Sequence, residues 1–416
     1  MEIQRDFYLN ELIRKQHNGF VKVITGLRRC GKSYLLRTIF KNHLLASGSR
    51  PEQIVEMAFD ERDNRKFCDP DVFYDFAKSK LDGQSETIFL LDEIQLLGDF
   101  ESVLNGLLGR KAEIYATGSN AKFLSKDIIT EFRGRGDEVH MTPLSFSEYY
   151  AVYNDDKIGR FQEYMLYGGL PPVVLANLPE DKISILNALY TETYLRDIVG
   201  RNKIRKSAEL ENLLDILSSS IGSRVNPEEL RNTFRSVKLS SITADTITRY
   251  ITYLEDAYLI EATQRYDIKG KAYIETPLKY YYSDLGLCNA RLNFRQLEET
   301  HSMENIIYNE LRHRRFNVDV GQITVNEKNT MGTYSRKHLE VDFVANKGSK
   351  RYYIQSAYMI PDEEKREQEI RSLLKIDDSF KKIVITSHAP APLYDDHGIL
   401  TMSVYDFLLN PDSLEF

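Results

Sequence analysis

An octet with glycine at its first and sixth positions stands near the start of the chain: Gly26-Leu27-Arg28-Arg29-Cys30-Gly31-Lys32-Ser33. The apolar run 20–24 precedes it and predicts a strand, and leucines at helical spacing follow it. The octet fits the pattern G-x-x-x-x-G-K-S without a mismatch. Glycines let the backbone curl so that N–H groups face a phosphate, and a helix N-terminus favours an anion. The sequence therefore predicts a phosphate-binding loop between a strand and a helix.

The chemistry of the octet indicates ATP as ligand and Mg²⁺ as cofactor. Lys32 is long enough to contact the β- and γ-phosphates, and the hydroxyl of Ser33 is a ligand for Mg²⁺. We expect all eight residues and the following Tyr34 to line the nucleotide site. Tyr8, ahead of the first strand, is a candidate for stacking on the adenine.

A second element follows the apolar run 87–91, which ends on Asp92 and Glu93. Asp92 at the strand tip is expected to hold Mg²⁺, and Glu93 to act as the base on the attacking water. The alternative is a helix N-cap, for which Asp is also favoured. Together with the upstream loop, the pair predicts hydrolysis in addition to binding.

Two further polar segments are candidates for contact with the γ-phosphate. Asn120 or Ser119 follows the run 113–117, where a sensor residue would stand, with a solvated turn as the alternative. Arg135, with Arg133 in reserve, is a candidate for stabilising charge on the transferring phosphoryl group. Its alternative is a basic surface loop.

The first 150 residues alternate strand and helix patterns, with strands expected at 20–24, 54–59, 87–91, 113–117 and 137–141. This order predicts an α/β fold with a parallel sheet. A chain of 416 residues should hold two to four domains. From about residue 300 a second α/β unit is expected, with a helix near 302–314 and strands near 338–345, 351–357 and 382–386.

Composition restricts the class of protein. No apolar run approaches the roughly 20 residues that span a bilayer, and no secretory signal is visible, so we expect a cytoplasmic protein without membrane contact. The three cysteines form no C-x-x-C pair, which fits a reducing compartment. Because the net charge is -7, contact with nucleic acid would need local basic patches.

These residues together resemble a bacterial and archaeal family of AAA-type ATPases. In the first 150 residues the resemblance rests on Gly26 to Ser33, Asp92-Glu93, Thr117-Gly118-Ser119, Gly134-Arg135 and Pro143-Leu144-Ser145-Phe146. It continues in Tyr167-Gly168-Gly169-Leu170-Pro171, Tyr194-Leu195-Arg196-Asp197-Ile198, Tyr281 to Leu287, Glu304-Asn305 and Glu340-Val341-Asp342-Phe343. It implies an AAA-type ATPase core at 1–150, a helical lid at 151–220, a winged-helix segment at 221–292 and a restriction-endonuclease-like domain at 293–416.

The endonuclease-like domain is expected to lack cleavage. Nucleases of the restriction type place an Asp and then Asp/Glu-x-Lys on a strand hairpin, where carboxylates hold Mg²⁺ and the lysine acts on water. Asp342 fills the first place and Glu304 a supporting one. Gln355 stands in place of the second carboxylate, and Ala357 in place of the lysine. Neither residue can replace the chemistry that is missing.

The partner of the C-terminal half is left open between nucleic acid and protein. Two basic segments, 196–206 and Arg312 to Arg315, are candidate contacts for nucleic acid, with solvated helix faces as the alternative. The helix expected within 241–255 carries Asp245 and Glu255 against Arg249, a poor match to DNA phosphates.

We therefore expect an ATPase that uses its nucleotide cycle to move or switch C-terminal partner-binding domains. The alternative is an ATP-regulated DNA nuclease or DNA-binding protein, whose nuclease form would need a displaced lysine, Lys347 or Lys350. A nucleotide-dependent scaffold is a third interpretation, which Glu93 argues against. If Arg135 acts on a neighbouring subunit, the protein is a homo-oligomer.

Overall fold

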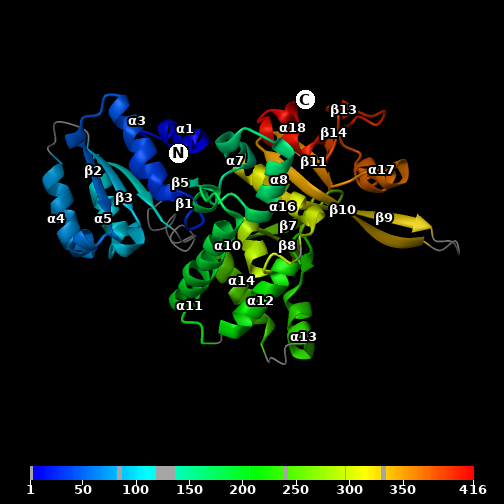
Figure 1. The fold of residues 1–416 in the computed structure, drawn as a ribbon, viewed down its shortest axis with the longest axis horizontal. Helices are drawn as coiled ribbons and strands as arrows, with labels where there is room; N and C mark the ends of the chain where they lie inside the picture. Colours follow the sequence, from blue (N-terminus) through cyan, green and yellow to red (C-terminus); the bar gives the residue numbers. More distant parts are fainter. Residues whose placement is uncertain are drawn as a thin grey trace. The chain divides into compact units, whose positions relative to one another are not determined.

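The computed structural model describes residues 3–81, 87–118, 136–205, 207–237, 242–295, 297–328 and 334–416. The chain divides into two compact units, one of residues 1–143 with 256–258 and one of residues 144–255 with 259–416. Figure 1 shows their elements along the chain. No helix within the described ranges has both the length and the apolar character that crossing a membrane requires.

The first unit is built on a parallel sheet of five strands in the order β2-β3-β4-β1-β5. The strands are β1 (Val21–Thr25), β2 (Ile54–Ala58), β3 (Ile88–Asp92), β4 (Glu113–Thr117) and β5 (Gly136–His140). All residues of β1, β3 and β4 are buried, as expected of a sheet covered on both faces. The predicted α/β class and parallel sheet are confirmed.

Helical segments connect these strands. They are α1 (Asp6–Arg14), α2 (Lys32–Tyr34), η1 (Leu35–Phe40), α3 (Lys41–Ala46), η2 (Pro51–Gln53), η3 (Arg62–Cys68), α4 (Pro70–Lys80), η4 (Ile94–Leu96) and α5 (Phe100–Leu108). Phe73 of α4 and Leu104 of α5 join Phe89 of β3 and Ile114 of β4 in one buried cluster. These two helices therefore cover one face of the strands that carry the acidic pair.

Gly26 directly follows β1, where the backbone passes close to the chain after β5. Its φ is +126°, and a Cβ there would lie 1.9 Å from the carbonyl oxygen of Met141. The N–H of Met141 donates to the oxygen of Thr25 at 2.8 Å, which fixes this approach. Packing of the sheet edge therefore requires glycine at position 26.

The second unit begins with helices. They are α7 (Phe146–Tyr153), α8 (Lys157–Tyr167), α9 (Pro171–Val174), α10 (Pro179–Ala188), η6 (Leu189–Leu195), α11 (Arg196–Arg201) and α12 (Ser207–Ser219). Their glycine-rich break packs against α15 (Leu285–Arg291). The N–H of Gly169 donates to Asp284 Oδ2 at 2.8 Å, and a Cβ on Gly286 would lie 2.1 Å from the oxygen of Tyr167. The segments 167–171 and 281–287, both part of the family resemblance, therefore pack against each other.

Nine strands of the second unit form one mixed sheet in the order β13-β14-β12-β11-β10-β9-β7-β8-β6. They are β6 (Arg224–Val225), β7 (Ile260–Asp267), β8 (Ala272–Tyr282), β9 (Asn317–Lys328), β10 (Tyr334–Lys347), β11 (Lys350–Ala357), β12 (Lys381–Thr386), β13 (Leu393–Tyr394) and β14 (Ile399–Ser403). The remaining helical elements are α13 (Pro227–Val237), α14 (Ala244–Asp256), α16 (Glu299–His313), α17 (Glu363–Ile370), η7 (Leu373–Lys375), α18 (Val404–Leu409) and η8 (Ser413–Glu415). The helix and strands expected after residue 300 are confirmed.

One pairing joins the two halves of this sheet. β7 runs parallel to β9, with Arg265 opposite Val320 and Asp267 opposite Gln322. Ile268, just after β7, packs in the same buried cluster as Ile323 of β9. The segments 221–292 and 297–416 therefore share one sheet, and their predicted division into separate domains stays a prediction.

Candidate functional site

The glycine-rich octet forms a curled loop between β1 and a helical run. Arg29 and Gly31 both have positive φ, at 68° and 106°, and Lys32 begins α2. Helical backbone continues through η1 and α3 to Ala46. The predicted order of strand, loop and helix is confirmed.

The ammonium of Lys32 is folded into this loop. Its Nζ donates to the carbonyl oxygens of Gly26 at 2.9 Å and Leu27 at 3.0 Å, and the side chain is 5% exposed. A cation held only by neutral carbonyls has no anionic partner among these contacts. The arrangement therefore fits a phosphate group that would bind Lys32 in place of the two carbonyls.

Ser33 and Asp92 meet at the strand edge as the sequence predicts. The hydroxyl of Ser33 donates to Asp92 Oδ1 at 3.0 Å, and Asp92 is 3% exposed at the end of β3. Arg37 Nη1 lies 4.0 Å from Asp92 Oδ2. A hydroxyl beside a carboxylate is a donor set that suits Mg²⁺, so these two residues fit the cofactor.

Glu93 follows Asp92 in a left-handed conformation, with φ at 53°. Its N–H donates to Thr117 Oγ1 at 2.9 Å, and Gln95 Nε2 donates to its carboxylate. Left-handed backbone is unfavourable for a residue with a side chain, and it persists where neighbours hold it in place. Hydrogen bonding thus fixes the residue predicted to be the base.

Thr117 is the residue that sequence reasoning missed. It is the last residue of β4, and its hydroxyl donates to Asp92 Oδ1 while accepting from the N–H of Glu93. One hydroxyl therefore joins the predicted metal ligand to the predicted base. Its position at a strand end was the available signal, whereas the prediction named Ser119 and Asn120.

The other predicted residues of the loop have different surroundings. Leu27 and Cys30 are buried, and the Cys30 thiol donates to the carbonyl oxygen of Met141 at 3.5 Å, so both side chains pack inside the unit. Arg28 is half-buried, while Arg29 and Tyr34 are exposed. Side chains of this loop thus face both the core and the solvent.

Asn120 and Arg135, with Ser119 and Arg133, lie outside the described residues. The assignment of Tyr8 to adenine stacking is wrong. Its ring is fully buried, and its hydroxyl accepts from the N–H of Thr142 at 3.0 Å.

Comparisons with known proteins bear on both units. Residues 18–150 match the family model of an AAA domain, and residues 158–298 match a domain of unknown function, DUF8612. An uncharacterized protein of Haemophilus influenzae is 33% identical over 414 residues, which cover 98% of each chain. This chain belongs to the same family. An uncharacterized protein of Methanocaldococcus jannaschii is 28% identical over 408 residues, 93% of this chain and 85% of its own.

The first unit therefore carries an AAA-type P-loop ATPase domain. Among solved structures, the Aeropyrum pernix Orc1 protein in complex with DNA is similar over 70% of this chain and 93% of its own, at 12% identity and a TM-score of 0.29. Cdc6p from Pyrobaculum aerophilum is similar over the same shares, at 11% identity and a TM-score of 0.30.

Outside the AAA domain, the predicted acidic residues lie in a buried cluster of the second unit. Glu304 of α16 is 6% exposed and Asp342 of β10 is 8% exposed. Burial, together with the negative charge of Glu304, raises the pKa of Asp342 well above its usual value. Burial opposes ionisation of Glu304, but the charge of Lys279 together with hydrogen bonds from His301, Tyr281 and Lys279 lowers the pKa of Glu304. Within the described residues, no group of three or more His, Cys, Asp or Glu side chains is arranged to hold a metal ion.

The displaced lysines proposed from sequence do not reach this cluster. Lys347 Nζ donates to the carbonyl oxygen of Arg314, and Lys350 pairs with Glu415. The lysine that is present comes from β8: Lys279 Nζ lies 2.9 Å from Glu304 Oε1. No spacing rule within the last domain could have identified it.

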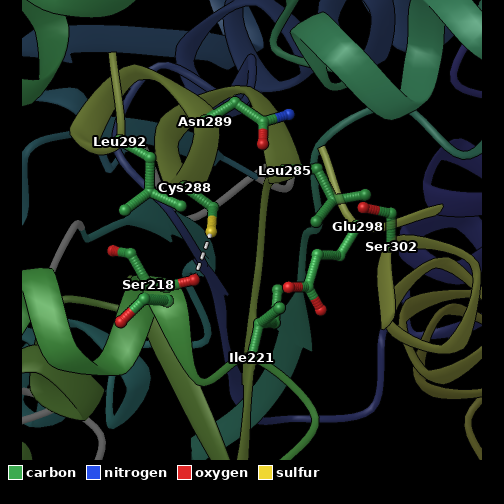
Figure 2. A pocket seen from close by; sticks show the side chains of 9 residues that line it. Ser218, Ile221, Leu285, Cys288, Asn289, Leu292, Glu298 and Ser302 are labelled. Carbon is green, nitrogen blue, oxygen red and sulfur yellow. Dashed lines mark hydrogen bonds between the residues drawn. The ribbon is translucent and has the colours of Figure 1, made fainter. Parts of the chain in front are cut away.

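One cavity of the second unit is too small for a ligand. Figure 2 shows its lining, in which Cys288 of α15 faces Ser218 of α12 and donates to its carbonyl oxygen at 3.6 Å. Its volume of about 20 Å³ has room for about one water molecule. Burial raises the pKa of the Cys288 thiol to about 12, so the thiol is unsuited to nucleophilic chemistry.

Proposed function

We propose that this protein hydrolyses ATP in its AAA domain and uses the nucleotide cycle to change how its second unit binds a partner. The observation that carries the proposal is the connected set Ser33–Asp92–Thr117–Glu93. A protein that only binds ATP has no use for a carboxylate held beside the metal ligand. The set joins the residues that hydrolysis needs.

Each residue has a distinct part in the proposed reaction. Lys32 exchanges the carbonyls of Gly26 and Leu27 for phosphate oxygens of ATP. Ser33 and Asp92 would hold Mg²⁺, which neutralises charge on the phosphates when bound. Glu93 accepts a proton from the attacking water while its backbone N–H stays bonded to Thr117.

Glu93→Gln tests the hydrolysis. Glutamine keeps the shape of the side chain but cannot accept the proton, so the variant should bind ATP normally and release phosphate at least a hundredfold more slowly. Glu52→Gln is the matched control, because Glu52 is exposed at the opposite end of the sheet, just before β2. Normal phosphate release in Glu93→Gln would remove the base assignment.

The second unit has features that support a winged-helix segment. The order α12, β6, α13, α14, β7, β8, with β8 paired to both β6 and β7, is the topology of that motif. Its hairpin strand β7 is engaged by β9, and the exposed face of α14 offers Arg249 beside Asp245. Such a surface attracts phosphates poorly.

We propose that the partner is a protein. The basic run Arg312 to Arg315 does not form a surface patch, because Arg314 is 8% exposed and pairs with Glu310, while Arg312 pairs with Glu261. The exposed arginines and lysine of 196–205 are the feature that favours DNA instead. Phosphate release measured with and without single- and double-stranded DNA separates the two, because stimulation by DNA would contradict a protein partner.

We also propose that the endonuclease-like part, supported by Glu304 on α16 and Asp342 on β10, cleaves no DNA. Ala357 is buried and cannot act on water, and Gln355 is neutral. Divalent-cation-dependent cleavage of linear DNA that disappears in Asp342→Ala would overturn this part.

A further inference from the structure

One buried lysine connects three elements of the second unit. Lys279 Nζ, from β8, lies 2.9 Å from Glu304 Oε1 of α16 and 2.7 Å from Glu340 Oε1 of β10. Its side chain is 4% exposed. The hydroxyl of Tyr281, two residues along β8, also donates to Glu304 Oε1 at 2.7 Å. We call Lys279, Glu304, Glu340 and Asp342 the lysine–carboxylate cluster.

The carboxylates around the ammonium of Lys279 are of the kind that bind a metal cation in other proteins. Carboxylates brought together from a helix and a strand are the usual ligands of a hard divalent cation. Glu304 and Asp342 are the residues that the sequence pattern assigns to metal in an endonuclease-like domain. Glu340 is two positions before Asp342 on β10.

Two buried amide oxygens add to the donors beside this cluster. Gln322 is directly opposite Glu340 across the β9–β10 pair, so the two side chains share one face of the sheet. On the other side of β10, the printed pairing with β11 ends at Phe343 opposite Ile354, and the N–H of Ser356, next to Gln355, donates to Asp342 Oδ2 at 2.8 Å.

Among the residues that the structure describes, the Oε1 atoms of Gln322 and Gln355 are buried without a hydrogen-bond partner, and Gln322 is 6% exposed. Buried acceptors are normally satisfied. These two unsatisfied acceptors stand on β9 and β11, the strands that flank the carboxylates of β10, and amide oxygens are ligands that a hard cation accepts.

Cations of the protein already pair with both glutamates of the cluster. Lys279 pairs with Glu304 and Glu340, and Arg224 Nε donates to Glu340 Oε2 at 2.8 Å. Two cations thus meet two glutamates. His301 lies 3.7 Å from Glu304 and adds further positive charge when protonated. A divalent cation would meet repulsion here as long as Lys279 is in place.

We propose that the lysine–carboxylate cluster is a divalent-cation site closed by Lys279, whose ammonium takes the place of the metal. The protein then binds no divalent cation at this cluster, and the second unit holds its three elements together without one. Removal of the ammonium alone, with all carboxylates retained, opens the site to a hard cation such as Mn²⁺. The proposal does not depend on ATP hydrolysis.

The test is Mn²⁺ binding to the full chain without nucleotide, followed by the electron paramagnetic resonance signal of free Mn²⁺. Lys279→Met should bind one Mn²⁺ per chain at least tenfold more tightly than the unchanged protein. Adding Asp342→Asn to Lys279→Met should abolish that gain. Lys269→Met, which removes a half-exposed lysine from the turn between β7 and β8, is the matched control and should bind no more than the unchanged protein.

Three outcomes would overturn the proposal. The first is one tightly bound Mn²⁺ in the unchanged protein that Asp342→Asn removes, because the site would then be open. The second is a folded Lys279→Met variant that gains no Mn²⁺. The third is a thermal unfolding result. Lys279→Met and the charge-balanced Lys279→Met/Glu340→Gln are both expected to unfold at higher temperature when Mn²⁺ is added. Failure of Mn²⁺ to stabilise either variant would show that a metal cannot replace the ammonium.

Discussion

Thr117→Val is the sharpest perturbation of the proposed ATPase site, because valine keeps the shape of threonine and removes only the hydroxyl. That hydroxyl donates to the carboxylate of Asp92 and accepts from the N–H of Glu93. A hydrogen bond to a charged group contributes about 1.5–3 kcal/mol, and a buried donor left unpaired costs about 1–3 kcal/mol. Because Ser33 still donates to Asp92, we expect the free energy of unfolding to fall by about 2–4 kcal/mol.

The effect on turnover follows from the backbone of Glu93. Its left-handed conformation, at φ 53°, loses the hydrogen bond that Thr117 supplies. Displacement of the base should raise the barrier by about 1.4–2.7 kcal/mol, which is a ten- to hundredfold lower kcat. ATP binding should change far less, since Lys32 and the loop are untouched.

The assay pairs phosphate release with nucleotide binding and thermal unfolding, each for Thr117→Val and Thr117→Ser. Serine retains the hydroxyl, so Thr117→Ser should recover most of the lost turnover. Equal turnover in the unchanged protein and a folded Thr117→Val would refute the role of this hydroxyl. An equal loss in Thr117→Ser would refute it too, because packing of the methyl group would then be the cause.

Three further outcomes are expected. Lys32→Ala should weaken ATP binding by about tenfold or more, measured by titration with a fluorescent nucleotide, because it removes a charged phosphate contact worth about 1.5–3 kcal/mol. Gly26→Ala should lower the unfolding temperature and abolish turnover, since its Cβ would overlap a backbone oxygen; Gly48→Ala, also at positive φ but with nothing within 4 Å, should cost only about 1–2 kcal/mol and leave turnover intact. Lys22→Met breaks the buried pair with Glu113 and should cost about 3–5 kcal/mol in urea unfolding, and adding Glu113→Gln should restore much of it.

Much of the first unit could be predicted from the sequence because its signals are local. Mainly apolar runs predicted the first four strands, the more polar segment 137–141 was predicted as the fifth, and each overlaps an observed strand. The loop was identifiable because the backbone needs glycine at both of its ends, and Ser33 and Asp92 meet because strand ends of a parallel sheet share an edge. These features follow from short-range pattern and one general rule of topology.

Residues whose role depends on contacts between distant segments were harder to predict. The sequence pattern shows Thr117 only as the last residue of a buried strand. Its hydroxyl reaches Asp92 because of the register between β3 and β4, which the sequence does not reveal. Tyr8 is an aromatic residue ahead of the loop in sequence, but its ring is buried and its hydroxyl accepts a hydrogen bond from the N–H of Thr142. A sequence motif shows which residues share a segment and not which side chains of other segments meet them.

Lys279 of the second unit is another residue whose role depends on contacts between distant segments. The nuclease pattern predicts a lysine at position 357, yet the cation comes from β8, which the sequence assigns to a different domain. An ion bound from solution can leave, but an ammonium on a four-carbon stem is held by the chain. In the proposed arrangement, Lys279 joins β8 to α16 and β10 without a metal, and the pairing of β7 with β9 continues the sheet across the same segments. Under this proposal, the carboxylates that the nuclease pattern assigns to a metal instead hold β8, α16 and β10 together through Lys279.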